Sequence, residues 1–334
     1  MIQVSFIIPV YNATPYIQKC LDSIFALGIL EDEMEIICVN DCSPDNTAEV
    51  ITEIAKEHPS VVLINHPENK RQGGGSNTAI RAARGEYAVF MDQDDTILPY
   101  DLLDEIQYMR DNDLELLLGK VVCLNQDGST RYWANYSEET PIMTGPQFFR
   151  DELINKVGFG AVWMGIYKTD LIKRTAPFVE KMIYEDTDWC YRCTYNAQRV
   201  QYKPLDMYLY HDNPNSSTHN VPINCLVWRV RASQRLYNWA QSEDIVAERD
   251  AVHEAAAHFY TWNLTGIGSI WKYGMRDRHQ FFKTFSDEEY KVFKQWPRSY
   301  WQMVILQYPL LSEACLIALA PLARLLKQIK RLVK

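Results

Sequence analysis

The sequence has too few basic residues for a nucleic-acid-binding protein. Its 34 Lys and Arg residues are outnumbered by 43 Asp and Glu residues, so the formal net charge is −9. Proteins that bind nucleic acid neutralise its phosphates with a basic face, and this chain has no such surplus. With 47% hydrophobic and 23% charged residues, the composition otherwise predicts a globular protein with a sizeable core.

Long apolar runs and paired metal-binding cysteines are also scarce. The first residues lack a basic segment and the apolar run breaks at Pro9, so we expect a strand there and no signal peptide. Cys190 and Cys193 form a C-x-x-C motif without a second pair at zinc spacing, which leaves a redox or zinc role open. No disulfide framework is implied, so we expect a cytoplasmic, reducing compartment.

The first part of the chain alternates short β-rich runs with helical patterns. This alternation is typical of an α/β protein with a mostly parallel central sheet. We expect one α/β domain over residues 1–220 and a helical region over residues 221–334. The expected strands are residues 4–10, 35–39, 61–64, 87–91, 200–203 and 207–210, and the expected helices are residues 17–25, 47–55, 78–84, 99–111 and 185–197.

Polar residues follow three of the expected strands. Tyr11 and Asn12 come after the first, Asn40 and Asp41 close the second, and residues 92–95 follow the fourth. Because ligands of parallel sheets bind beyond the carboxyl ends of the strands, we expect these side chains to share one site.

The run Asp92-Gln93-Asp94-Asp95 predicts a divalent metal site. Carboxylates are hard oxygen ligands, and three acids within four residues repel one another unless a cation is present. Such a cation, Mn²⁺ or Mg²⁺, would neutralise a leaving diphosphate. The alternative is a polar turn in which Asp95 or Thr96 caps the next helix.

These segments together resemble the family 2 glycosyltransferases, which have the GT-A fold. The resemblance rests on residues 5–12, on residues 40–47 with the pattern D-x-S-x-D-x-T, on Asn69 and Asn77, and on residues 85–95. It covers residues 3–220. It implies an inverting enzyme that moves a sugar from a nucleotide diphosphate sugar, with UDP as the expected nucleotide, to an acceptor hydroxyl.

The resemblance also assigns roles to single residues. Asp41 would accept a hydrogen bond from the nucleobase, Asp94 would be the main metal ligand, and His211 would approach the diphosphate or the metal, although a lone His at a strand end is more often structural. The implied donor-binding residues are Pro9, Tyr11, Asn12, Asp41, Asn77, Asp92 and Gln93, and the implied metal ligands are Asp94, Asp92 and His211.

One departure from the family pattern concerns the segment before Asn77. The family has Arg where this chain has Ser76, and we expect Arg71 to take over its contact with phosphate or sugar. Three glycines, residues 73–75, lie between them. They lack the spacing of a phosphate-binding loop, and we interpret them as room for a closely packed donor.

A second acidic site follows Tyr184. Glu185 and Asp186 resemble the family's E-D motif, in which the Asp is the base, so Asp186 would deprotonate the acceptor and Glu185 would bind it. The alternative is a helix start enriched in acids by the macrodipole. Trp163 would either stack on an acceptor sugar or belong to the core.

The last residues, 314–334, combine an apolar stripe with five basic residues at helical spacing. This pattern is typical of a helix lying on a membrane surface or of a helix docked on the protein body. If this segment lies on a membrane, we expect the enzyme to act at the cytoplasmic face of that membrane. We expect its acceptor to be a saccharide or a lipid-linked saccharide, and its role to be in the synthesis of cell-surface polysaccharide or glycolipid.

Two other functions remain open from the sequence. Residues 92–96 also fit the D-x-D-x-T pattern of haloacid-dehalogenase-type phosphatases, in which Asp92 would be the nucleophile. The other is a catalytically silent sugar-binding protein.

Overall fold

A computed structural model describes residues 1–134, 136–151, 160–213, 223–253 and 256. The chain divides into two compact units, one of Met1–Val221 with Arg231–Ala256 and one of Pro222–Val230 with Ala257–Lys334. The boundary near residue 220 stays a prediction. The basic amphipathic segment 314–334 lies outside the described residues. Over the part that is described, no helix is both long enough and apolar enough to cross a bilayer.

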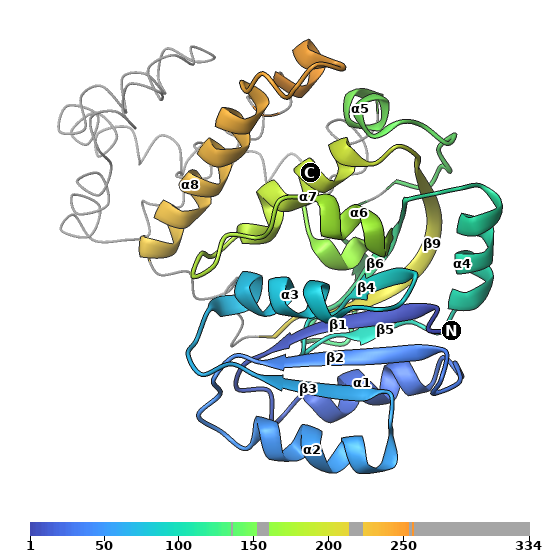
Figure 1. The fold of residues 1–334 in the computed structure, drawn as a ribbon, viewed down its shortest axis with the longest axis vertical. Helices are drawn as coiled ribbons and strands as arrows, with labels where there is room; N and C mark the ends of the chain where they lie inside the picture. Colours follow the sequence, from blue (N-terminus) through green and yellow to red (C-terminus); the bar gives the residue numbers. More distant parts are fainter. Residues whose placement is uncertain (135, 152–159, 214–222, 254–255, 257–334) are drawn as a thin grey trace, which may run out of the picture. The chain divides into compact units, whose positions relative to one another are not determined.

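The first half of the chain forms the predicted alternation of strands and helices (Figure 1). Four strands pair in parallel in the order β3-β2-β1-β4, and their side chains form much of the core. The elements are β1 (Val4–Val10), α1 (Ile17–Phe25), β2 (Met34–Asn40), α2 (Thr47–Glu57), β3 (Val61–Asn65), α3 (Arg71–Ala82) and β4 (Tyr87–Phe90).

Beyond β4 the sheet becomes mixed. Within the described residues it continues as β8-β6-β9-β5, with β8 antiparallel to both β4 and β6, β6 parallel to β9, and β7 paired with β6. The parallel arrangement we expected therefore holds for the first half. The elements are β5 (Thr96–Ile97), α4 (Leu102–Asp111), β6 (Leu116–Leu124), β7 (Thr130–Tyr132), α5 (Gly145–Phe148), β8 (Gly165–Lys168), α6 (Thr169–Arg174), α7 (Glu185–Asn196), β9 (Val200–His211) and α8 (Ile223–Ala240).

The two strands predicted at 200–203 and 207–210 are a single strand, β9. Its register against β6 shifts between the pairs Tyr202–Leu118 and Asp206–Lys120, so that β9 has extra residues at this point. Pro204 lies there, and a proline that cannot donate to a ladder is tolerated at such a bulge. The bulge interrupts the alternating pattern without ending the strand.

The turn after β4 does not cap a helix. Thr96 belongs to strand β5, and the next helix, α4, begins at Leu102 with its N-terminus capped by the side chain of Asp101, which accepts from the backbone N–H of Asp104 at 3.0 Å. The capping alternative for Asp95 and Thr96 is therefore wrong.

The three glycines 73–75 lie inside helix α3, which begins seven residues before the predicted start. A Cβ on Gly75 would stand 2.8 Å from the Cβ of Pro9 in β1, and a Cβ on Gly73 would stand 2.8 Å from the Cγ of Glu185. Our interpretation of these glycines as room for the donor is wrong, because protein atoms fill that space. Close packing outweighs the low helix propensity of glycine.

Gly75→Ala should destabilise the protein by about 1–3 kcal/mol, because the new methyl group overlaps Pro9 in a packed interface. On an open helix surface the same change would stabilise by up to about 1 kcal/mol. The free energy of unfolding in urea measures the effect. Gly160→Ala is the matched control, since no described atom lies within 4 Å of the position that its new methyl group would take. A Gly75→Ala protein as stable as wild type would contradict the close packing.

Candidate active site

The polar residues after β1, β2 and β4 meet at one edge of the sheet. The parallel register places Val10 beside Asn40 and Ile7 beside Phe90, so the three strands end in the same region. The site that we describe lies beyond these carboxyl ends, as in other sheets of this kind.

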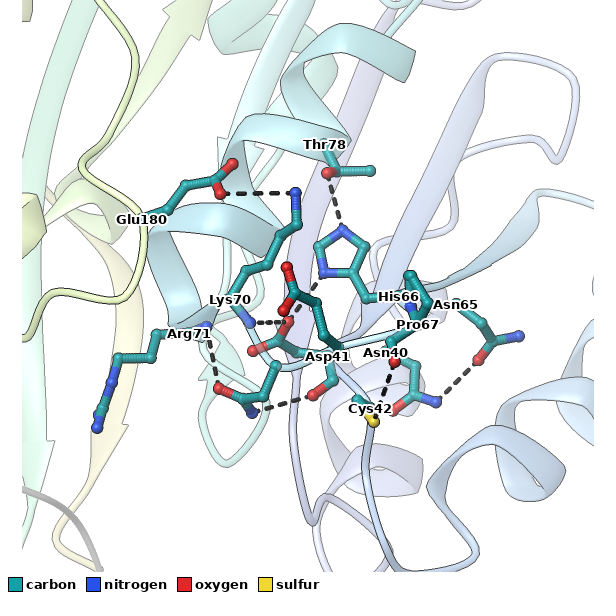
Figure 2. Close-up of polar contacts among 12 residues, drawn as sticks. Asn40, Asp41, Cys42, Asn65, His66, Pro67, Lys70, Arg71, Thr78 and Glu180 are labelled. Atoms are coloured by element: carbon teal, nitrogen blue, oxygen red, sulfur yellow. Dashed lines mark hydrogen bonds and ion pairs between the residues drawn. The ribbon is translucent and has the colours of Figure 1, made fainter.

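The carboxylate of Asp41 is held from one side only (Figure 2). Its Oδ1 accepts from Nδ1 of His66 at 2.8 Å and from the backbone N–H of Lys70 at 2.8 Å. The backbone carbonyl of Asp41 accepts from the amide of Asn69 at 3.0 Å. The Asp41 side chain is 3% exposed, and its Oδ2 has no partner among the described residues. A buried acceptor without a donor costs about 1–3 kcal/mol, so this atom is suited to a ligand N–H.

Asp45 organises the two loops that flank Asp41. Its Oδ2 accepts from the hydroxyl of Thr14 at 2.8 Å, and its Oδ1 accepts from the backbone N–H of Thr47 at 3.2 Å and from the hydroxyl of the same residue. Burial alone would raise the pKa of Asp45, but the hydrogen bonds from Thr47 and Thr14 lower it. The second acid of the D-x-S-x-D-x-T pattern therefore supports the loops and the start of α2.

Gln93 joins the acidic turn to the end of β1. Its Oε1 accepts from the backbone N–H of Tyr11 at 2.6 Å, and its Nε2 donates to the carbonyl of Tyr11 at 2.9 Å. The side chain that we expected to bind the donor is thus engaged with backbone. The Tyr11 residue is 44% exposed, and Asn12 follows it with φ of 53° and donates its N–H to Ser43 at 3.2 Å.

Asp92 and Asp94 each have one oxygen bound by an amide. Oδ1 of Asp92 accepts from Nε2 of Gln72 at 2.5 Å, and Oδ2 of Asp94 accepts from Nδ2 of Asn213 at 2.9 Å. Burial raises the pKa of Asp92, and the charges of Asp94 and Asp186 raise it further. The hydrogen bonds from these two amides therefore do not fully offset the negative charge of the turn.

Asp95 is a structural member of the acidic turn. Its Oδ2 accepts from the hydroxyl of Tyr208 at 2.8 Å and its Oδ1 accepts from the backbone N–H of His211 at 2.7 Å. Burial raises the pKa of Asp95, with added effects of Asp92 and Asp94. Nε2 of His211 lies 3.0 Å from the hydroxyl of Thr96, so metal ligation by this ring nitrogen would replace that contact.

A divalent cation fits this turn in the way that Mg²⁺ is often bound, through one or two carboxylates and substrate phosphates. The amide of Asn213 occupies one oxygen of Asp94 and leaves the other for a cation, whereas Asp92 accepts from Gln72 and from Trp163, and a cation would offset the repulsion between the two carboxylates. Among the described residues, no group of three or more His, Cys, Asp and Glu side chains is arranged to hold a metal alone. The metal ligands stay a prediction.

The start of α7 brings two further acids to this centre. Tyr184 precedes the helix with φ of 63°, and Glu185 and Asp186 form the first turn together with Asp188. Burial raises the pKa of Asp186 to about 6. It raises the pKa of Glu185, which is 6% exposed, well above the usual range, and the charges of Asp186 and Asp92 add to this effect. Two acidic sites that are far apart in sequence therefore lie within electrostatic reach.

Asn77 binds protein where we expected it to shape the donor pocket. Its Nδ2 donates to the carbonyl of Phe178 at 2.9 Å and its Oδ1 accepts from the N–H of Phe178 at 2.9 Å. This buried pair of hydrogen bonds ties α3 to the segment that leads into α7.

Arg71 begins α3 with φ of 61°, and its side chain extends away from Asp41 (Figure 2).

Trp163 is 6% exposed and stacks on Tyr208, with ring centroids 5.0 Å apart and an interplanar angle of 14°. A hydrogen bond from Trp163 lowers the pKa of Asp92. The ring thus packs in the core and supports the acidic turn, while stacking on an acceptor stays a prediction. Cys190 and Cys193 are buried free thiols on α7.

Our sequence analysis missed three polar residues of this region. His66 follows β3, and the rule that we applied to the other strand ends identifies it as well. Gln72 and Asn213 gave no comparable signal, because their contacts with Asp92 and Asp94 depend on how α3 and the residues after β9 pack.

Comparisons with known proteins agree with this architecture. A family model described as Glycosyl transferase family 2 matches residues 5–175. The chain is 29% identical over 230 residues to the glycosyltransferase YibD of Escherichia coli K12, covering 67% of this chain and 64% of that protein. It is 31% identical over 172 residues to a poly(ribitol-phosphate) beta-glucosyltransferase of Bacillus spizizenii, covering 51% of this chain and 26% of that protein.

A solved structure shares the fold. The crystal structure of Staphylococcus aureus TarS 1–349 in complex with UDP-GlcNAc matches with a TM-score of 0.70 at 21% identity, over 92% of this chain and 87% of that one. The sequence matches to YibD and to the beta-glucosyltransferase span less than two thirds of those relatives.

Glu185→Gln should stabilise the protein at neutral pH. In the folded protein, burial and the neighbouring acids raise the pKa of the Glu185 carboxyl, whereas the unfolded chain ionises it above an ordinary pKa of about 4.3. Wild type therefore loses stability relative to the variant as the pH rises from about 4 to 7. We expect the stability advantage of the variant to be smallest near pH 4 and to grow as the pH rises to 7.

Urea unfolding of both proteins between pH 4 and pH 7 measures this advantage. Glu57→Gln, at an exposed position at the end of α2, is the control and should follow wild type. An advantage that does not change with pH would show that the effect of Glu185→Gln is packing and not ionisation.

Proposed function

The chain belongs to glycosyl transferase family 2, and from this membership we propose that it is an inverting glycosyltransferase that moves a sugar from a UDP-sugar to an acceptor hydroxyl. One observation carries the proposal. Asp92, after β4, and Asp186, at the start of α7, lie close enough for the charge of Asp186 to raise the pKa of Asp92. A donor-side acid and an acceptor-side acid thus flank one reaction centre.

The donor binds along the edge formed by β1 and β2 in this proposal. The unpartnered Oδ2 of Asp41 accepts a nucleobase N–H, and the exposed ring of Tyr11, beside Pro9 and Asn12, covers the base. Arg71, at the start of α3, reaches the diphosphate or the sugar, while Asn77 and Gln93 keep the surrounding backbone in place. The bound UDP-GlcNAc of the TarS structure supports UDP as the nucleotide.

Asp94 and Asp92 would hold Mn²⁺ or Mg²⁺, with His211 beside them. When bound, the cation supplies Lewis-acid stabilisation of the charge on the leaving diphosphate. The chain's own part is to hold the carboxylates, through Gln72, Asn213 and the hydrogen bond from Trp163.

Asp186 is the base in this mechanism. The acceptor oxygen attacks the anomeric carbon from the face opposite the diphosphate, its proton passes to the carboxylate of Asp186, and the bond to the diphosphate breaks with its electron pair on UDP. A pKa of about 6 keeps Asp186 ionised at neutral pH and able to take up a proton. Burial raises the pKa of the neighbouring Glu185 and so favours its protonated form, which suits it to bind an acceptor hydroxyl.

The acceptor we propose is a saccharide or a lipid-linked saccharide, bound near Glu185 and Trp163. The beta-glucosyltransferase relative is named for poly(ribitol-phosphate), which supports a role in cell-surface polysaccharide or glycolipid synthesis. We further propose that the protein is located in the cytoplasm and contacts the membrane through residues 314–334.

The family match overturns the phosphatase alternative, because it spans residues 5–175 and includes Asp92 within a glycosyltransferase sequence. An assay of UDP release distinguishes the enzyme from a catalytically silent sugar-binding protein. The silent protein would bind a donor but would not release UDP when acceptor is added.

Asp94→Ala should abolish metal-dependent UDP binding and leave the fold intact, because Asp94 lies in a partly exposed turn after β4. Calorimetric titration of UDP with and without Mn²⁺ measures this. The exposed Asp32→Ala is the control and should bind as wild type does. Unchanged Mn²⁺-dependent binding by Asp94→Ala would remove Asp94 from the metal site.

Asp186→Asn should lower turnover by about 10²–10⁴-fold, because an amide of the same shape cannot take up the acceptor proton. UDP affinity should hardly change, since Asp41 and the acidic turn hold the donor. Glu185→Gln is the matched comparison and should mainly raise the KM for the acceptor. Steady-state UDP release with a competent acceptor tests both variants, and a loss of turnover confined to Glu185→Gln would reassign the base.

A further inference from the structure

His66 lies behind Asp41 in a chain of buried polar contacts (Figure 2). The residue comes directly after strand β3, and its side chain is 7% exposed. One ring nitrogen, Nδ1, lies 2.8 Å from Oδ1 of Asp41, and the other, Nε2, lies 2.9 Å from the hydroxyl of Thr78 on helix α3. The imidazole thus spans the space between Asp41 and α3.

The hydrogen bonds of this chain have a direction. Arg81 donates to the oxygen of Thr78 at 2.9 Å, and a guanidinium can only donate. At the other end, the carboxylate of Asp41 can only accept, so Nδ1 of His66 is the donor in its contact with Oδ1. The imidazole N–H therefore ends on the carboxylate, and the hydroxyl of Thr78 contacts the other ring nitrogen.

The result is a carboxylate with one satisfied and one free oxygen. Oδ1 of Asp41 receives two hydrogen bonds, from His66 and from the backbone of Lys70, while Oδ2 is buried and has no partner in the described part of the chain. Because the two oxygens of a carboxylate are equivalent, the contacts from His66 and Lys70 fix the orientation of the group, and the oxygen that they leave without a donor is the one available to a ligand.

We propose that His66 is a positioning residue for nucleobase selection. It holds Asp41 so that Oδ2 accepts a ring N–H, which admits uracil and excludes cytosine. Uracil carries a hydrogen on N3, whereas N3 of cytosine is an acceptor whose lone pair would meet that of the carboxylate. This inference rests on the proposed UDP-sugar donor and adds the residue that makes its recognition specific.

Calorimetric titrations of the full chain with UDP, CDP and inorganic pyrophosphate test the inference. His66→Leu removes both contacts of the ring. His66→Asn places an amide N–H near the position of Nδ1 and retains the bond to Asp41, whereas His66→Gln places its N–H near Nε2 and loses that bond. The three variants therefore separate contact with Asp41 from packing.

We expect His66→Leu to weaken UDP binding by roughly 10–100-fold, the effect of a hydrogen bond to a charged group, without weakening pyrophosphate or CDP. His66→Asn should restore most of the UDP affinity and His66→Gln should not. UDP affinity unchanged in His66→Leu would overturn the inference. An equal loss for UDP, CDP and pyrophosphate would also overturn it, because it would indicate a general structural defect.

Circular dichroism establishes whether each variant folds. If His66→Leu does not fold, the Asn and Gln variants decide, and stronger UDP binding by Gln than by Asn would overturn the inference. The wild-type titration reports on the proposed function by itself. A wild-type protein that does not bind UDP contradicts the donor assignment and the role of His66, whereas UDP binding that is insensitive to His66 contradicts only the latter.

Discussion

The close packing of helix α3 against the sheet is the constraint on which the site depends. Gly75 brings the helix against Pro9 of β1, and Gly73 brings it against Glu185 at the start of α7. Held at this distance, α3 supplies the backbone N–H of Lys70 to Asp41 and the amide of Gln72 to Asp92. A methyl group on either glycine would overlap protein atoms, so these contacts and the packing are established together.

The same helix connects the two chemical halves of the centre. Asn77 fixes Phe178 by two hydrogen bonds, and the backbone of Lys70 accepts from the N–H of Lys181 at 2.9 Å. Both partners belong to the segment that leads into Glu185 and Asp186. The residues that we propose to surround the donor and the residue that we propose as the base are therefore positioned by one element, as is required when reacting atoms must meet in a defined geometry.

The clustered carboxylates of this site destabilise the folded protein. Burial and mutual repulsion raise the pKa values of Asp92, Asp95 and Glu185, which is the opposite of what stabilises a folded protein. Amides and hydroxyls from Gln72 and Tyr208 offset part of this cost, and a cation with a diphosphate would offset more. Local conflict of this kind is expected where a protein binds and reacts.

The sequence by itself determined the alternating first half of the fold, the edge at which Asp41 and the acidic turn meet, and the family, because apolar periodicity and the residues after each strand are local signals. It did not determine the roles of Asn77, Gln93 and the three glycines, which contact protein where the pattern predicted ligand. It also gave no sign that His66 supports Asp41. Only the tertiary structure decided these, because each depends on which atoms of a distant segment lie within hydrogen-bonding or van der Waals distance, and that distance is set by packing between elements and not by the local chain.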